Sequence, residues 1–345
     1  MSSPAPAGAR FVSGSTTRHV VVMASTGAVG LMAVFAVDLI NLFYISLLGE
    51  KEIAAAVGFA GVVGFFHTSV SIGLTIGISA VVSRHRLLGR FERAQFAADA
   101  RRLAQVAAPA LLTNLATPVG AAFVTHSIAQ FGPAAVAGQA TIDRLTPVAF
   151  GIVYALSGAV GPILAQNLGA RQYERVRQGL RDSLLFMVMA VGLAWAVLAL
   201  AQHALVRAFS AQGQAAELIH VFCSWLAAGF FFVGALFVAN AAFNNLGRPL
   251  WSTAFNWMRA TLGTIPFAWW GSRYGPIGVI AGQALGTAVF GTLALVFAFR
   301  LTARLAPRED GEAASPEASA LSAASHTALA PVVEPAQTVR GSLSN

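Results

Sequence analysis

Most of the sequence is divided into apolar stretches that are each long enough to cross a lipid bilayer. Eight such stretches can be marked, at approximately 20–48, 53–83, 103–130, 134–166, 183–209, 216–246, 250–271 and 276–300. A spanning helix needs about 20 apolar residues, and helices satisfy their own backbone hydrogen bonds in lipid. The sequence therefore predicts an all-α fold, a polytopic membrane helix bundle with about eight transmembrane helices.

Charged residues are scarce, and they lie mainly between the apolar stretches. They make up 10% of the chain, against about 25% in a typical soluble domain. The net charge is +8, but its placement at the ends of spans indicates contact with the lipid bilayer and anionic headgroups rather than with nucleic acid. We therefore expect the lipid bilayer as a partner and no nucleic acid.

The basic residues alternate between the two sides of the predicted bundle. One side would carry Arg10, Arg18, the basic run within 84–102, Arg171, Arg175, Arg177, Arg181, Arg248, Arg300, Arg304 and Arg308. The other side would carry only Lys51, Arg207 and Arg273. The positive-inside rule makes the first side cytoplasmic. We expect a multi-pass protein of the bacterial cell (inner) membrane with both termini in the cytoplasm.

Several classes of chemistry have no support in the sequence. The single cysteine, Cys223, excludes an intrachain disulfide and is expected to be a small buried residue. No metal-ligand spacing, phosphate-binding loop or dinucleotide fingerprint is present. We therefore expect a protein that is not an enzyme and that holds no metal or organic cofactor.

The segments outside the spans differ from them in composition. Residues 1–17 are rich in Ala, Ser, Pro and Gly, and residues 302–345 in Ala, Ser, Pro, Glu and Thr. Both are expected to be disordered, the second as a cytoplasmic tail. Residues 84–102 form a basic segment that is expected to be a cytoplasmic linker. The first segment does not read as a signal peptide, because the apolar run that follows is too long.

Three stretches resemble the multidrug and toxic compound extrusion (MATE) family of transporters. They are "FAVDLINLFYISLLGEKEIAAAVGFAG" at 35–61, "SGAVGPILAQNLGARQYERVR" at 157–177 and "ANAAFNNLGRPLWSTAFNWMRATLGTIPFAWWG" at 239–271. The pattern of Gly161, Pro162, Gln166, Asn167 and Gly169 is fairly specific where it closes a span before a basic loop. The resemblance covers roughly residues 18–300.

The resemblance also implies a departure from the family. Family members have twelve spans in two lobes of six helices, and this sequence has eight candidate spans. Residues 18–83 resemble the start of the N-terminal lobe, and residues 103–301 a complete six-span C-terminal lobe. Four spans are therefore expected to be missing near residues 83–90.

Asp38 is one of two acidic residues that fall well inside the predicted spans. A charged carboxylate at the centre of a membrane helix costs about 2.5–3.5 kcal/mol on insertion scales, so the residue is a functional candidate by default. We expect it to be buried in its span. The resemblance implies that Asp38 binds the coupling ion, H⁺ or Na⁺. The alternative is a structural aspartate that is hydrogen-bonded to neighbouring helices.

Asp143 is the other intraspan acid, and a set of polar residues accompanies it. Neighbouring residues on a helix point about 100° apart, so Asp143 need not pair with Arg144. Arg259 is expected either to reach the headgroups or to pair with a carboxylate. The candidate cavity-lining residues are Asn41, Tyr44, Asn114, Gln139, Asp143, Asn240, Asn244, Asn256 and Gln283. Hydrogen bonding from helix to helix is the competing role for each of them.

The resemblance implies a secondary active exporter. The influx of H⁺ or Na⁺ would drive the outward movement of small, amphipathic, often cationic organic compounds or drugs by alternating access. The alternative is a degenerate remnant that inserts into the membrane without a complete cavity. Self-association of two chains could complete that cavity. Transport of a lipid-linked pyrophosphate ranks lower, because only Arg144 and Arg259 could face the cavity as cations.

Overall fold

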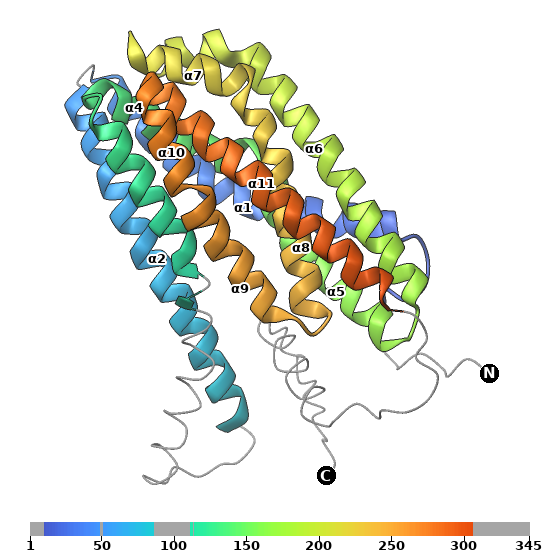
Figure 1. The fold of residues 1–345 in the computed structure, drawn as a ribbon. Helices are drawn as coiled ribbons and strands as arrows, with labels where there is room; N and C mark the ends of the chain where they lie inside the picture. The colour runs from blue at the N-terminus through green and yellow to red at the C-terminus, as the bar shows by residue number, and fades with distance from the viewer. Residues whose placement is uncertain (1–9, 49–50, 86–110, 113, 306–345) are drawn as a thin grey trace, which may run out of the picture.

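The computed structural model describes residues 10–48, 51–85, 111–112 and 114–305, and every regular element in these ranges is a helix (Figure 1). The first two helices are α1 (Thr16–Ser46) and α2 (Lys51–His85). A helical stretch over 114–129 precedes α4. The remaining α-helices are α4 (Pro133–Ala149), α5 (Gly151–Gly169), α6 (Tyr173–Ala208), α7 (Gln214–Ser224), α8 (Phe230–Asn245), α9 (Pro249–Met258), α10 (Ile265–Gly271) and α11 (Gly275–Ala303). The predicted all-α class is confirmed.

Five of the described helical runs are long and apolar enough to cross a membrane. They are Thr16–Ser46, Gly151–Gly169, Tyr173–Ala208, Leu226–Asn245 and Pro249–Ala303. Two predicted spans are interrupted, because 134–166 is divided at Phe150 into α4 and α5, and 216–246 is divided at Trp225 into α7 and α8. The predicted linker 84–102 and most of the predicted tail lie outside the described residues. The count of eight spans stays a prediction.

The run from Pro249 to Ala303 folds back on itself as a helical hairpin. A short turn of 3₁₀ helix at Ser272–Tyr274 joins α10 to α11. Gly278 and Gly271 face each other near this turn, and Gly286 faces Gly263 farther from it. The partners move backward along the first helix as α11 advances, so the two helices are antiparallel, as Figure 1 shows.

Main-chain atoms meet directly along this hairpin, with no side chain between them. A methyl group added to Gly286 would lie 1.4 Å from the carbonyl oxygen of Gly263, and one added to Gly282 would lie 2.2 Å from that of Phe267. Glycine at helix interfaces is what permits such an approach in membrane proteins. The hairpin is therefore a fixed unit whose spacing allows no side chain at these positions.

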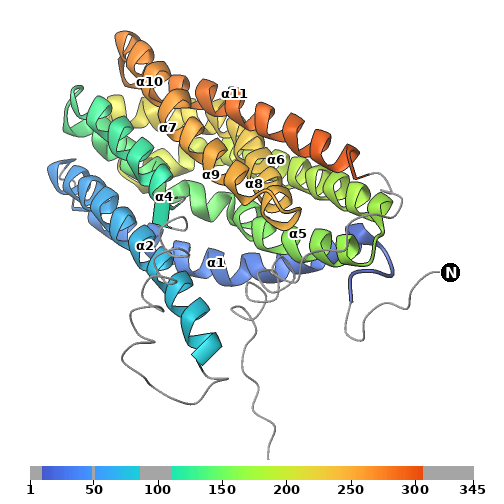
Figure 2. The ribbon, with the colours of Figure 1, turned by 60° about the horizontal axis from the view of Figure 1, so that its bottom comes forward.

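The start of α1 is fastened to the α5–α6 region by polar contacts. The hydroxyls of Thr16 and Thr17 both donate to Oδ2 of Asp182 on α6. The buried face of α1 includes Val20 and Ala24 and packs mainly against α5. Figure 2 shows α1 crossing beneath α5 while α2 runs beside α4.

The segment before α1 is held in place, which corrects the expectation of disorder for residues 10–17. The backbone N–H of Phe11 donates to Oε1 of Gln166 at 3.0 Å. Its carbonyl oxygen accepts from Nδ2 of Asn167 at 3.1 Å and from Nη2 of Arg175 at 3.2 Å. Composition alone missed these contacts, because the Gln-Asn pair that closes α5 supplies the partners. Residues 1–9 lie outside the described residues.

The hairpin predicts the effect of one substitution. Gly286→Ala should destabilise the protein by about 1–3 kcal/mol, because the added methyl group must displace backbone rather than a flexible side chain. Thermal unfolding in detergent, followed by size-exclusion chromatography with fluorescence detection, measures the effect. Gly192→Ala on α6 is the matched control, since nothing lies within 4 Å of a methyl group there. Equal melting temperatures for the two variants would contradict the prediction.

Candidate functional site

Gln139 and Asp143 form the first part of the candidate site, one turn apart on α4. This helix begins at Pro133, after Gly132 takes the left-handed conformation with φ of 95°. Nε2 of the buried Gln139 donates to Oδ1 of Asp143 at 2.7 Å. Oε1 of Gln139 is buried and has no hydrogen-bond partner among the described residues. The aspartate side chain itself is exposed. Oδ1 of Asp143 therefore accepts a hydrogen bond from Gln139, while the rest of the carboxylate remains accessible.

Arg144, the next residue on α4, reaches a different neighbour, although it stays within electrostatic range of Asp143. Its guanidinium lies against α2, where a methyl group added to Gly61 would meet Nη2 at 3.5 Å. Asp143 takes its hydrogen bond from Gln139 instead. The side chains of Asp143 and Arg144 thus have different direct neighbours.

Arg259 is the basic group of the candidate site, and it lies at a local change in helix geometry. It starts a single turn of π-helix, Arg259–Gly263, between α9 and α10. Turns of this kind occur frequently at functional sites. Nη2 of Arg259 donates to the hydroxyl of Thr117 at 3.1 Å, and its Nε is buried without a partner among the described residues. Part of the guanidinium is therefore available to another acceptor.

Tyr154 on α5 adds a phenol and a ring to the candidate site. Its hydroxyl is within electrostatic range of both Arg259 and Asp143. Its ring packs against Phe35 of α1 and Phe237 of α8, with centroids 5.9 and 5.3 Å away. Phe150 and Phe230 stack beside it at 4.2 Å. The site thus combines a carboxylate, a guanidinium and a phenol with an aromatic wall.

Tyr154 and Thr117 were not among the residues predicted from the sequence. A hydroxyl or phenol inside an apolar stretch was the available signal, and Tyr154 is one of only four tyrosines in the chain. Neither the π-helix nor the distance between α5 and the α9–α10 junction can be inferred from local hydropathy.

The other predicted cavity residues in the second half of the chain are spread over several helices. Asn240 on α8 has a buried Oδ1 without a partner among the described residues, and Asn244 on the next turn is exposed. Asn256 donates to the carbonyl of Ser252 at 2.8 Å in its own helix. Gln283 on α11 and Asn114 before α4 are half-buried. A transport role for these residues stays a prediction.

Asp38 does not lie where the sequence analysis expected it. It was expected to be buried, but its side chain is exposed, as are those of Asn41 and Tyr44 on the same helix. The physical reason is that α5 and α6 pack on the other face of α1, through residues such as Val20 and Ala24. None of the described helices covers the face that carries Asp38. Its role in ion coupling stays a prediction.

Comparisons with known proteins agree with this fold. A model of the MatE family matches residues 109–270. An uncharacterized 21 kDa protein of the iaaL 5′ region of Pseudomonas savastanoi is 35% identical over 205 residues, which cover 57% of this chain and 66% of that protein. The FAD transporter of Shewanella oneidensis is 32% identical over 203 residues, which cover 58% of this chain and 45% of the transporter. The chain thus spans between about half and two thirds of the length of these relatives.

A solved structure shares the arrangement of the helices. It is the outward-facing conformation of a multidrug resistance MATE family transporter of the MOP superfamily. The match has a TM-score of 0.68 with 12% identity, and it covers 88% of this chain and 99% of that chain. At this identity the likeness concerns the fold. The family model thus identifies a MatE domain over residues 109–270, and the described helices share the fold of MATE transporters.

Proposed function

We propose that the protein is a secondary active transporter that exchanges H⁺ or Na⁺ for amphipathic, often cationic organic compounds by alternating access. The observation that carries the proposal is a polar site between α4, α5, α8 and the α9–α10 junction whose buried hydrogen-bonding groups are not all paired. Two of its buried atoms, Oε1 of Gln139 and Nε of Arg259, have no partner among the described residues. Buried polar atoms are normally paired, so their free valences suit a ligand or ion.

Each group in the site has a chemical use in binding an organic cation. The open side of the Asp143 carboxylate can accept a hydrogen bond from an amine. The aromatic wall around Tyr154 suits the flat, apolar part of such a compound, because aromatic faces attract cations and stack with planar rings. Binding at this site would couple α4 and α5 to α1 through the contact between Tyr154 and Phe35.

Asp38 is the proposed coupling carboxylate, on the strength of the family resemblance. Its exposed position on α1 adds a physical constraint. The surrounding face is apolar, with Val34, Val37 and Ile40 all exposed. A charged carboxylate that faces hydrocarbon costs about 2.5–3.5 kcal/mol. This cost favours protonation, ion binding or coverage of the face by polar groups.

The coverage that we propose is a second copy of the chain. Two identical α1 faces related by a twofold axis would bury each other and shield both copies of Asp38 from lipid. The arrangement would also supply a wall opposite α4 and α5. Asn41, one turn from Asp38, would provide an amide for hydrogen bonding across the interface.

A second candidate function is the export of flavin dinucleotides. The Shewanella oneidensis relative is a FAD transporter. A guanidinium with a free Nε at Arg259 suits a pyrophosphate oxygen, and the aromatic wall suits a flavin ring. This candidate makes Arg259, rather than Asp143, the principal substrate contact.

Substitution of the proposed coupling residue tests the mechanism. Asp38→Asn should abolish efflux driven by a pH or Na⁺ gradient in proteoliposomes, because the amide cannot exchange a proton or bind Na⁺ with a full charge. Binding of a fluorescent organic cation should remain. Glu217→Gln, an exposed carboxylate on α7, is the matched control and should transport normally. Gradient-driven efflux by the Asp38 variant would refute the assigned role, and failure of the wild-type protein to transport would favour the non-transporting remnant.

Two substitutions in the site separate the two substrate classes. Asp143→Asn should weaken binding of an organic cation by about tenfold or more and leave FAD binding nearly unchanged, since one charge-assisted hydrogen bond is worth about 1.5–3 kcal/mol. Arg259→Gln should have the reverse effect. Equilibrium binding of ethidium and of FAD to purified protein measures both. Equal losses for both ligands in both variants would show that neither group discriminates between them.

Cysteine crosslinking tests the proposed dimer. The chain has a single, buried cysteine, Cys223, so a new surface cysteine can be studied without competition. Val37→Cys should give a covalent dimer with a bifunctional maleimide in membranes, because the two α1 faces would be adjacent. Val188→Cys on α6, which is also exposed and apolar, should remain monomeric. Monomer for both variants would contradict the proposal.

A further inference from the structure

A basic hollow lies where α6 begins and α11 ends, and none of its lining residues belongs to the proposed transport site. It has a volume of about 520 Å³ and is lined by the turn before α6, the first turns of α6, and Leu305. Three of its lining residues are arginines, Arg171, Arg175 and Arg177, and one is the acid Glu174. The lining therefore carries a formal excess of two positive charges.

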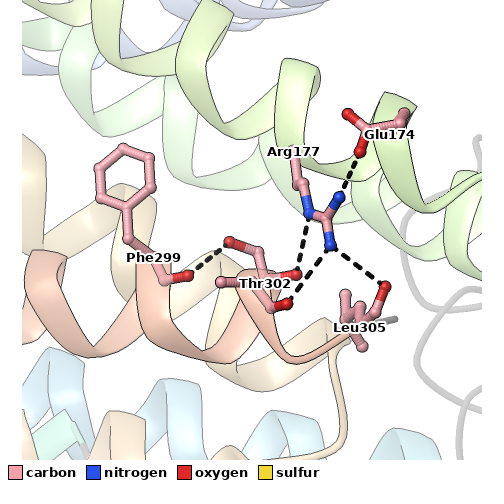
Figure 3. Close-up of polar contacts among 6 residues, drawn as sticks. Glu174, Arg177, Phe299, Thr302 and Leu305 are labelled. Atoms are coloured by element: carbon pink, nitrogen blue, oxygen red, sulfur yellow. Dashed lines mark hydrogen bonds and ion pairs between the residues drawn. The ribbon is translucent and has the colours of Figure 1, made fainter. Parts of the chain in front are cut away.

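One of these arginines, Arg177, caps the C-terminal end of α11 through Nε and Nη2, and its Nη1 contacts Glu174. Figure 3 shows the guanidinium of Arg177 between Glu174 and the last carbonyls of that helix. It donates to the carbonyl oxygens of Thr302 and Ala303 at 3.3 Å each and to that of Leu305 at 3.5 Å. The last carbonyls of a helix lack partners within the helix, and a cation there is also favoured by the helix dipole. Arg177 is therefore a structural part of the hollow.

The other two arginines have binding capacity left. Arg175 uses Nε and Nη2 on Asn167 and Phe11, which leaves Nη1. Arg171 is exposed, its backbone N–H donates to the carbonyl oxygen of Leu168, and its guanidinium has no hydrogen bond to the described residues. It stands in the left-handed conformation, with φ of 57°. This conformation turns the chain sharply between α5 and α6, and it places Arg171 at the edge of the hollow.

The hollow also offers main-chain donors and a buried acceptor. No side chain caps the N-terminus of α6 at Gln172, so the first N–H groups of the helix remain available to an anion. Oε1 of Gln172 is buried and has no partner among the described residues. The hollow thus combines donors suited to a phosphate with an acceptor suited to a neighbouring hydroxyl.

Two apolar stripes lead away from this hollow along the neighbouring helices. On α6 the exposed residues are Leu185, Val188, Met189, Leu193, Val197 and Leu200. On α11 they are Phe299, Val296, Leu293, Val289 and Leu285. The α11 set repeats every three or four residues, and so does the α6 set apart from the adjacent pair Val188 and Met189, so each set forms one face of its helix. These faces would contact acyl chains whose headgroup sits in the hollow.

We infer that the hollow binds the headgroup of an anionic phospholipid with free hydroxyls, of the phosphatidylglycerol class. The phosphate would lie between Arg171, the free nitrogen of Arg175 and the first N–H groups of α6. A headgroup hydroxyl would donate to Oε1 of Gln172 once that side chain, whose Oε1 is buried without a partner among the described residues, turns into the hollow. Basic pockets between membrane helices on the cytoplasmic side bind anionic headgroups in this way. The inference is independent of the transported substrate.

Lipid binding to the purified, full-length protein in detergent tests the inference. Native mass spectrometry and thermal unfolding would be measured with phosphatidylglycerol, phosphatidylcholine and inorganic phosphate in turn. Phosphatidylglycerol should bind and raise the melting temperature, and the other two should have little effect. Stabilisation by inorganic phosphate to the same extent would show a soluble-anion site instead, and equal binding of phosphatidylcholine would overturn the role of charge.

Two variants locate the site, and a third serves as the control. Arg171→Gln should weaken phosphatidylglycerol binding by about tenfold, and Gln172→Leu should reduce the preference for phosphatidylglycerol over phosphatidic acid. Arg304→Gln removes an exposed arginine at the end of α11 that does not line the hollow. It should bind phosphatidylglycerol as the wild type does. Equal losses from Arg171→Gln and Arg304→Gln would reduce the effect to general surface charge and overturn the site.

Discussion

The close contact between the two helices of the last hairpin determines where the polar groups of the candidate site can lie. Gly263 and Gly286 meet through main-chain atoms, and Gly263 is also the last residue of the π-helical turn. Because no side chain can be inserted at that contact, the turn that starts at Arg259 is fixed relative to α11. The guanidinium is thereby directed toward Thr117 and Tyr154 rather than toward lipid. An apolar pair of helices thus fixes the position of a charge.

The turn between α5 and α6 has a comparable role at the other end of the bundle. Gln166, Asn167 and Arg175 hold the segment before α1, while Arg177 holds the end of α11. Asp182 adds a further contact to the start of α1. Polar residues that read from the sequence as a basic loop are mostly engaged in joining helices that are distant in the chain. Arg171 is an exception, which is why it is the focus of the lipid site.

The class of fold followed from the sequence, because hydropathy averaged over 20 residues depends little on detail. The breaks at Phe150 and Trp225 did not follow, since aromatic residues are ordinary members of apolar spans. Gln139 and Asp143 were marked singly, and their spacing of four residues was sufficient to place them on one face. The contribution of Tyr154 depends on α4, α5 and the α9–α10 junction meeting in space, which no local pattern contains. The exposure of Asp38 depends on which face of α1 is covered, and an even distribution of apolar residues around that helix conceals the answer.

The attachment of the segment before α1 has a consequence for how this region can change in evolution. Gln166, Asn167 and Arg175 all bind the main chain of Phe11, through its N–H and its carbonyl oxygen. Every residue except proline offers both groups, so these hydrogen bonds place no demand on the side chain at position 11. The Phe11 ring adds a separate, apolar demand, because it packs against the core and meets His19 edge to face at 5.3 Å. Substitution by another large apolar residue should therefore be tolerated at this junction, whereas proline would remove the N–H that Gln166 binds.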